Sequence, residues 1–356
     1  MIMQSNIGIV YALAAALLFG ASTPLAKLLI GSIHPLVLAG LFYLGSGIGL
    51  GVWLALRRSL RRAGTVDASL ARRDLPWLAA ATLAGGIAGP VFLMTGLSQV
   101  PASAASLLLN LEVVLTALLA WFAFHEHFDR RILLGMGLIV AAGSLLSWDS
   151  SAAGAGMQVP WGALSIAAAC LCWAIDNNVT RKISASDAVQ IAAVKGLVAA
   201  AVNLTAAWWL HLAMPATASI ASALVVGFCG YGLGLVLFVV ALRHLGTART
   251  GAYFSTAPFA GAGIALLLPG DKPGPLFWAA AILMSAGIWL HLTERHGHRH
   301  HHGRMAHTHR HSHDEHHQHE HDFDWDGSEP HVHPHQHEPL THDHPHFPDI
   351  HHRHRH

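Results

Sequence analysis

The chain has 356 residues, of which 53% are hydrophobic and only 12% are charged, and its formal net charge is +1. Charged residues make up about a quarter of an ordinary soluble domain, so this composition argues against a soluble globular protein. From Ile7 to Leu292 the chain repeats apolar stretches of about 18 to 25 residues, the length a helix needs to cross a hydrocarbon core of ~30 Å. The sequence therefore predicts an all-α membrane protein.

Ten transmembrane helices are expected in two groups of five, residues 7–148 and 161–292, with short loops between them. The first group is Ile7–Ile30, Pro35–Leu56, Leu75–Leu97, Ala102–Phe124 and Ile132–Trp148. The second group is Trp161–Val179, Ala188–Leu212, Ala221–Leu242, Thr250–Leu268 and Pro275–Leu292. A tail of different composition, residues 295–356, follows the last helix and is expected to be disordered.

Basic residues predict the orientation of these helices, because cytoplasmic loops carry an excess of Lys and Arg. If ten spans alternate, nearly all of the loop cations fall on one side: Arg57, Arg58, Arg61, Arg62, Arg72, Arg73, Arg130, Arg131, Arg181, Lys182, Arg243 and Arg249. Lys272 is the main exception. Both termini and the tail are then expected in the cytoplasm, with the protein in the cytoplasmic (inner) membrane.

The two groups of helices resemble each other at several landmarks. Gly8 and Lys27 are spaced like Gly162 and Arg181, and Gly85 and Gly89 match Gly230 and Gly234 at a second constant offset. At that second offset Glu126 corresponds to Asp271. Because each group has an odd number of spans, the second copy is expected to be inverted in the membrane, as in many secondary transporters.

One segment carries most of a resemblance to a known family: Pro101 to Trp148, PASAASLLLNLEVVLTALLAWFAFHEHFDRRILLGMGLIVAAGSLLSW. It is similar to the fourth and fifth helices of the drug/metabolite transporter superfamily, and within it to the EamA-type permeases. Glu126 and Gly143 stand at the family's loop acid and helix-five glycine, and Pro258 at its mid-helix proline. Asp271 replaces the usual Glu, and Val113 stands at the first-copy proline position. The resemblance covers about residues 7 to 292 and implies a ten-helix bundle and alternating-access transport, without implying a substrate.

Ionisable residues inside the predicted helices are the transport-pathway candidates, because a charge in hydrocarbon is costly and usually serves a function. Glu112 is the strongest of them, as a proton carrier or cation ligand, against a structural ion pair or hydrogen bond as the alternative. Asn110 lies two residues away and is expected on a different face. Asp176 and Lys195 are expected to pair across neighbouring helices, and Lys27 to snorkel to the interface, with substrate contact as the less favoured alternative.

Small residues and cysteines are expected to serve packing. Gly85, Gly89, Gly230 and Gly234 form small-xxx-small patterns that allow helices to approach closely. The three cysteines lie in apolar stretches and are interpreted as small buried hydrophobes rather than a disulfide framework or a metal site. Glu126 and Asp271 are expected at span ends, where they cap the following helix or hold a loop.

The tail holds 24 of the 30 histidines of the chain. Imidazole suits Zn, Ni, Co and Cu, and interleaved Asp and Glu can complete a coordination sphere, so several weak divalent-metal sites are predicted. A pH-responsive tail is the alternative. The candidate ligands are His307, His309, His311, His313, His316, His317, His319, His321, His331, His333, His335, His337, His342, His344 and His346.

The function expected from these features is secondary transport of a small solute, such as an amino acid or amine, with no required cofactor and a metal-binding tail. One alternative is a divalent metal (Ni, Co or Zn) transporter that uses the tail to capture or buffer ions, and another is a membrane-anchored metal sensor or storage protein. An enzyme is not expected, because no nucleophile elbow, phosphate loop or HExxH-type site is present. The expected partners are the solute, the lipid bilayer and, as one option, a second copy in a homodimer; nucleic acid is not expected.

Overall fold

A computed structural model describes residues 2–60, 70, 72–124, 130–152, 160–180, 183, 187–268, 271–292, 297–302, 305–311, 331–337 and 340–345. The chain divides into two compact units, Met1–Glu294 and Arg295–His356, and each is described by itself. In the first unit, all of the described regular structure is helical. The helices of its first half are α1 (Ile2–Ile30), α2 (Pro35–Leu60), η1 (Arg72–Asp74), α3 (Leu75–Ala81), η2 (Thr82–Ala88), α4 (Gly89–Gln99), α5 (Ala102–Leu108), α6 (Leu111–Phe124) and α7 (Arg130–Ala152). Those of its second half are α8 (Trp161–Thr180), α9 (Ala188–Trp209), α10 (Thr217–Gly227), η4 (Phe228–Leu233), α11 (Gly234–Phe254), α12 (Ala257–Leu267) and α13 (Pro275–Leu292).

Eight helices in the described part of the chain are long and apolar enough to cross a membrane, and two shorter apolar helices, Ala257–Leu267 and Pro275–Leu290, follow them. The expected ninth helix, Thr250–Leu268, differs from the structure, because a turn at Ser255 and Thr256 divides it between α11 and α12. The expected fourth helix is divided in the same way by a turn at Leu109 and Asn110. The turn at Leu109 and Asn110 has no Gly or Pro in it or directly after it, whereas Pro258 in the first turn of α12 marks the second interruption, because a proline removes a helix hydrogen bond and clashes with the preceding turn.

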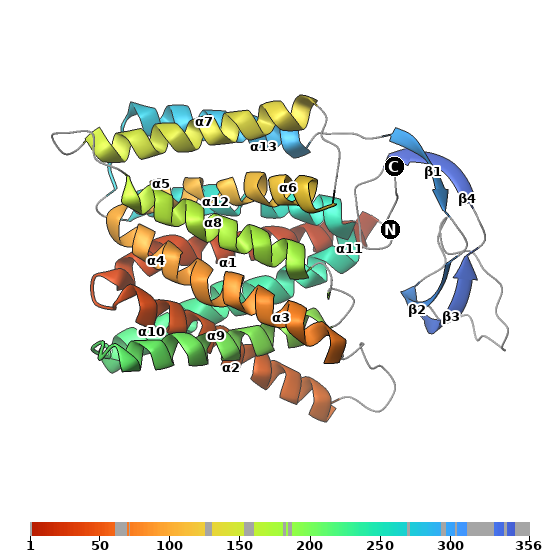
Figure 1. The fold of residues 1–356 in the computed structure, drawn as a ribbon, viewed down its shortest axis with the longest axis horizontal. Coiled ribbons are helices and arrows are strands. Elements are labelled where there is room, and N and C mark those ends of the chain that lie inside the picture. Colours follow the sequence, from red (N-terminus) through yellow and green to blue (C-terminus); the bar gives the residue numbers. More distant parts are fainter. Residues whose placement is uncertain are drawn as a thin grey trace. The chain divides into compact units, whose positions relative to one another are not determined.

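The helices pack as antiparallel and crossing neighbours (Figure 1): α2 lies along α9, α1 along α11 and α12, α4 along α8, and α7 along α13. Close approach depends on small residues, because lipid gives no hydrophobic drive for helix association. A Cβ on Gly20 would overlap the backbone of Ala257, and one on Gly196 would meet the backbone of Gly47 at 3.0 Å. These two sites fix the crossings of α1 with α12 and of α2 with α9.

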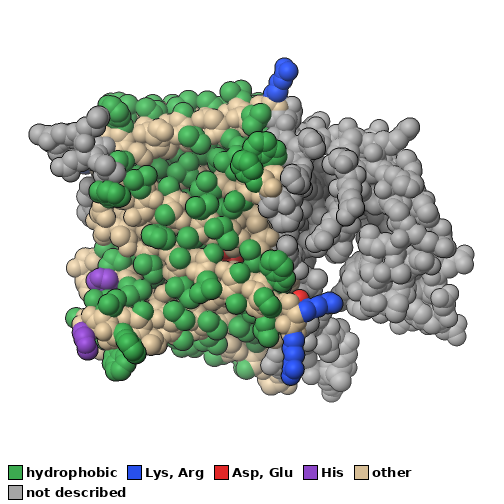
Figure 2. Space-filling model, in the orientation of Figure 1, with side chains coloured by type: hydrophobic (Ala, Val, Ile, Leu, Met, Phe, Trp, Pro, Cys, Tyr) green, Lys and Arg blue, Asp and Glu red, His purple; other side chains and the backbone are tan. Residues whose placement is uncertain are grey.

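The visible surface of the helical unit is mostly hydrophobic, with its Lys and Arg side chains gathered at one end (Figure 2). Large apolar side chains such as Phe122, Trp208 and Ile282 are exposed. This distribution is the reverse of a soluble protein, in which large exposed apolar patches are uncommon, and it suits a surface in contact with lipid.

The described residues of the tail form two two-stranded antiparallel sheets. β1 (Gly297–His302) pairs with β4 (Leu340–Pro345), and β2 (Met305–His311) pairs with β3 (His331–His337). The His-x-His alternation of the sequence has the period of two that a strand requires.

Candidate functional site

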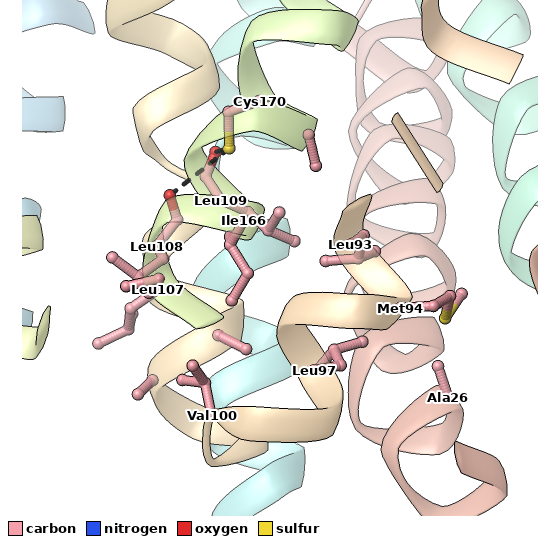
Figure 3. Close-up of a cluster of buried hydrophobic side chains, with 14 of the residues drawn as sticks. Ala26, Leu93, Met94, Leu97, Val100, Leu107, Leu108, Leu109, Ile166 and Cys170 are labelled. Carbon is pink, nitrogen blue, oxygen red and sulfur yellow. Dashed lines mark hydrogen bonds between the residues drawn. The ribbon is translucent and has the colours of Figure 1, made fainter. Parts of the chain in front are cut away.

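The interruption between α5 and α6 lies inside the helical unit and alters the backbone hydrogen bonding. The amide nitrogens of Asn110 and Glu112 bond to the carbonyls three residues earlier, at 3.0 Å each, instead of four. Cys170 of α8 lies against this turn, with its Sγ 3.7 Å from the carbonyl oxygen of Leu108 and 3.9 Å from that of Leu109 (Figure 3). A membrane offers no water to carbonyls released from a helix, so the thiol of a neighbouring helix serves as a weak donor.

Glu112 stands in the first turn of α6, directly after this interruption. Its Oε1 accepts a hydrogen bond of 2.8 Å from Asn177 Nδ2 of α8. A carboxylate in the first turn of a helix is favoured by the helix dipole. The next residue of α8, Asn178, donates to the carbonyl oxygen of Thr116 at 3.2 Å. The side chains of Asn177 and Asn178 on α8 therefore hydrogen-bond to two positions on α6, Glu112 and Thr116, and hold the two helices together.

Asp176 and Lys195 form an ion pair between α8 and α9. The Asp176 side chain is 10% exposed and the Lys195 side chain 16% exposed. Thr180 Oγ1 also donates to Asp176 Oδ1, at 2.9 Å. The sequence predicted this pair, and the structure contains it. Glu112, Asn177, Asp176 and Lys195 are called the polar cluster below, because Glu112 interacts electrostatically with both members of the ion pair.

A π-helical segment, η2, borders the polar cluster and exposes a backbone acceptor. The carbonyl oxygen of Gly85 accepts hydrogen bonds from Tyr43 OH at 2.8 Å and from Trp173 Nε1 at 3.0 Å. Asp176 lies directly against Gly85, where any Cβ would overlap its carboxylate. Four helical elements, α2, η2, α8 and α9, therefore meet at this point. π-helical turns are rare and occur frequently at functional sites.

The other predicted transport residues lie apart from the polar cluster. Asn110 is buried, and its Nδ2 donates to the carbonyl oxygen of Leu107 and approaches Met284 Sδ at 3.7 Å. Lys27 lies in the last turn of α1 and donates to the carbonyl oxygens of Leu97 and Val100. Asp271 accepts from the backbone nitrogen of Ser103 at 2.8 Å, so it caps α5 and not the helix that follows it.

The predicted packing glycines have different neighbours. Gly85 lies against Asp176, and a Cβ on Gly89 would lie 3.0 Å from Trp173 Nε1. A Cβ on Gly230 would lie 2.7 Å from Ser22 Cβ, whereas Gly234 has only ordinary contacts, the nearest at 3.4 Å.

Some predicted residues fall outside the described part of the chain. They include Glu126 and, in the tail, His313, His316, His317, His319, His321 and His346. The described tail histidines lie on strands: His307, His309 and His311 on β2, His331, His333, His335 and His337 on β3, and His342 and His344 on β4. In the part of the chain whose side chains the structure describes, no group of three or more His, Cys, Asp or Glu is placed to hold a metal ion.

Sequence reasoning missed Asn177 as the partner of Glu112, and Tyr43 and Trp173 as donors to the Gly85 carbonyl. The polar run Asp176-Asn177-Asn178 inside an apolar helix was a signal for the first. No local signal marks the aromatic donors, because their partner is a backbone carbonyl far along the chain.

Comparison with known proteins identifies the family. A model of the EamA-like transporter family matches residues 6–148 and again residues 160–293, which together are more than half of the chain. The chain belongs to the EamA-like transporter family. It is 27% identical over 293 residues to a protein of Methanothermobacter thermautotrophicus described as an uncharacterized transporter, covering 80% of this chain and 85% of that one. A solved crystal structure at 18% identity shares the fold with a TM-score of 0.58, over 81% of this chain and 95% of the other. This EamA-like protein is therefore a multi-pass membrane protein of a transporter family.

Proposed function

We propose that this protein is a secondary transporter that moves a small solute by alternating access, and that the polar cluster lies on its transport pathway. The observation that carries the proposal is the position of the cluster. Glu112, Asp176 and Lys195 lie within an otherwise apolar bundle, beside an interrupted helix and a π-helical segment. Transporters build substrate and ion sites from discontinuous helices of this kind.

Ten spans in two inverted repeats are the architecture we propose for the helical unit. Three features support it. The π-helical segments η2 and η4 contain Gly85 and Gly230, which correspond at one constant offset. The turns that divide the fourth and ninth expected helices correspond at the same offset to within one residue. The family model also matches the chain twice. Alternating access then follows from rocking one repeat against the other.

The orientation we propose has both termini in the cytoplasm and the protein in the cytoplasmic membrane. The support is the gathering of basic side chains at one end of the helical unit (Figure 2), the end that the positive-inside rule assigns to the cytoplasm. His34 and His211 mark the opposite end, where α1 passes to α2 and α9 to α10.

The cargo we propose is a small metabolite such as an amino acid or amine, with Glu112 as the group that exchanges a proton or binds a cation. Asn177 bonds to Glu112 through one oxygen only, which leaves carboxylate acceptors for a cargo or a proton. Purified protein in proteoliposomes tests this with amino acids, amines and divalent metals side by side. Saturable accumulation of one of these classes above protein-free vesicles supports transport; no such accumulation in either direction of the gradient argues against it.

The tail is proposed as a metal-binding appendage. Its backbone register places histidine opposite histidine at five positions, His298 with His344, His300 with His342, His307 with His335, His309 with His333 and His311 with His331. Directly opposite residues of an antiparallel pair have Cβ atoms about 4.5–5.5 Å apart, a spacing that suits shared ligation of one ion.

Divalent metal as the cargo remains a second candidate, and the same register favours it. Removal of the tail after Glu294 separates the two roles. If metal is the cargo and the tail captures it, the truncated protein takes up nickel or zinc with lower apparent affinity and leaves metabolite flux unchanged. If the tail is an appendage, the truncation leaves the transported metabolite's kinetics unaltered and no metal flux is seen in either form.

A further inference from the structure

A second polar site lies far from the polar cluster, at the end of the helical unit where α1 ends and α2 begins. A cavity of about 360 Å³ opens there between the end of α1, the α4–α5 connection, the end of α12, Leu268 and Asp271. Its volume is within the range of small-molecule sites. Two side chains of opposite charge line it, Lys27 and Asp271.

The two charged groups are held apart by bonds to the backbone. Lys27 Nζ donates to the carbonyl oxygens of Leu97 and Val100, the second at 2.9 Å. Asp271 Oδ2 accepts from the Ser103 amide at 2.8 Å. The two groups attract each other electrostatically, yet they form no direct ion pair within 4.0 Å. The backbone bonds therefore fix each charge on its own side of the cavity.

Each group keeps unused bonding capacity toward the cavity. An ammonium has three donors and a carboxylate has about four acceptor positions. Lys27 uses two of its donors, and Asp271 Oδ1 accepts no hydrogen bond from the residues that the structure describes. A ligand that offers an acceptor to Lys27 and a donor to Asp271 completes both sets.

The remaining wall sets the size and polarity of the ligand between these charges. Apart from Gln99 it is apolar, and it includes the small or rigid residues Pro24, Pro101, Ala102 and Ala265. A site with one positive and one negative wall selects against a ligand of net charge, since one wall then repels it. An apolar floor favours a short aliphatic group.

We propose that this cavity is a peripheral binding site for a zwitterionic solute, whose carboxylate binds Lys27 and whose ammonium binds Asp271, with a short aliphatic side chain against the apolar wall. A solute that enters from this end of the helical unit meets this site before the polar cluster. The physiological role rests on the proposed transport function, but binding at the cavity does not.

Binding of L-valine to the full-length protein in nanodiscs, measured by calorimetry, tests the proposal. Two probes serve as ligand controls, 3-methylbutanoate, which lacks the ammonium, and isobutylamine, which lacks the carboxylate. We expect valine to bind at least tenfold more tightly than either. Equal affinity for the three probes, or no valine binding at tens of millimolar, overturns the proposal.

Two variants remove one charge each, Lys27→Met and Asp271→Asn, and the Asn side chain can still accept from the Ser103 amide. We expect each to weaken valine binding at least tenfold, whereas Lys27→Arg retains binding within about threefold. Lys272→Met is the matched control, because Lys272 is exposed, adjacent to Asp271 and absent from the cavity lining. Wild-type affinity in both charge-removing variants, or an equal loss in Lys272→Met, overturns the assignment.

Transport in proteoliposomes separates this inference from the proposed function. Solute accumulation that is unchanged in Lys27→Met and Asp271→Asn, together with unchanged valine binding, refutes the cavity and leaves the transporter standing. Charge-dependent valine binding without movement of any solute across the vesicle membrane supports the cavity and refutes the transporter.

Discussion

The ion pair between Asp176 and Lys195 should behave as a unit on which the stability of the bundle depends. Both side chains are at least 84% buried by their exposed fractions of 10% and 16%. Asp176→Asn keeps an acceptor for the Thr180 hydroxyl and removes the ion-pair partner of the Lys195 ammonium. Removing one partner of a buried pair costs about 3–5 kcal/mol.

The assay is unfolding of detergent-solubilised protein, followed by tryptophan fluorescence, for Asp176→Asn, Lys195→Met and the double variant. We expect each single change to lower the free energy of unfolding by about 3 kcal/mol and the double variant to regain at least half of that loss. Ser285→Ala is the control, because that exposed hydroxyl bonds only to the carbonyl of Ala281 on its own helix. Losses in the single variants that simply add in the double variant, or single variants as stable as the control, would refute the pairing.

Three further predictions concern the bundle and the tail. Gly85→Ala should displace the Asp176 carboxylate and reduce solute flux at least tenfold, whereas Gly137→Ala, with nothing within 4 Å of the added Cβ, should keep wild-type flux. Equal flux in the two variants would contradict a role for the Gly85–Asp176 contact in transport. Calorimetry of the full chain with nickel or zinc at pH 7.5 should give several sites that are absent after truncation at Glu294, and these should weaken as pH falls below about 6 because histidines protonate; heat that persists in the truncated chain would place the sites elsewhere. The truncated chain should insert and run as a single species on gel filtration, since each membrane helix satisfies its own backbone hydrogen bonds; aggregation would show that the helical unit needs the tail.

Long apolar runs made the helices of the first unit predictable, and the pairing of Asp176 with Lys195 followed from two charges on neighbouring helices joined by a short connection. The interruption between α5 and α6 was not predictable. Leu109 and Asn110 carry no Gly or Pro, and the turn there depends on the thiol of Cys170 and other groups that only the packed bundle brings near. The hydrogen bonds to the π-helical segment η2 were not predictable either, because those from Tyr43 and Trp173 to Gly85 cross 42 and 88 positions of the chain.

The role of Asp271 illustrates the same limit. The sequence placed it at a span end and suggested that it caps the helix that follows or holds the loop. In the structure it caps α5, 168 positions earlier in the chain. Local sequence identifies a carboxylate near a helix end, but only the tertiary arrangement decides which helix end it reaches.

The measurement that tests the account most directly is solute accumulation in proteoliposomes by the wild type and by Glu112→Gln, driven by a proton gradient. The Gln side chain keeps the acceptor for Asn177 and removes the titratable charge, so the structural contact survives. We expect the variant to insert normally and to lose at least 90% of gradient-driven accumulation, whereas Ser144→Ala, an exposed hydroxyl bonded to the carbonyl of Val140, keeps wild-type accumulation. Wild-type accumulation and an unchanged pH profile in Glu112→Gln would contradict the place of Glu112 on the pathway.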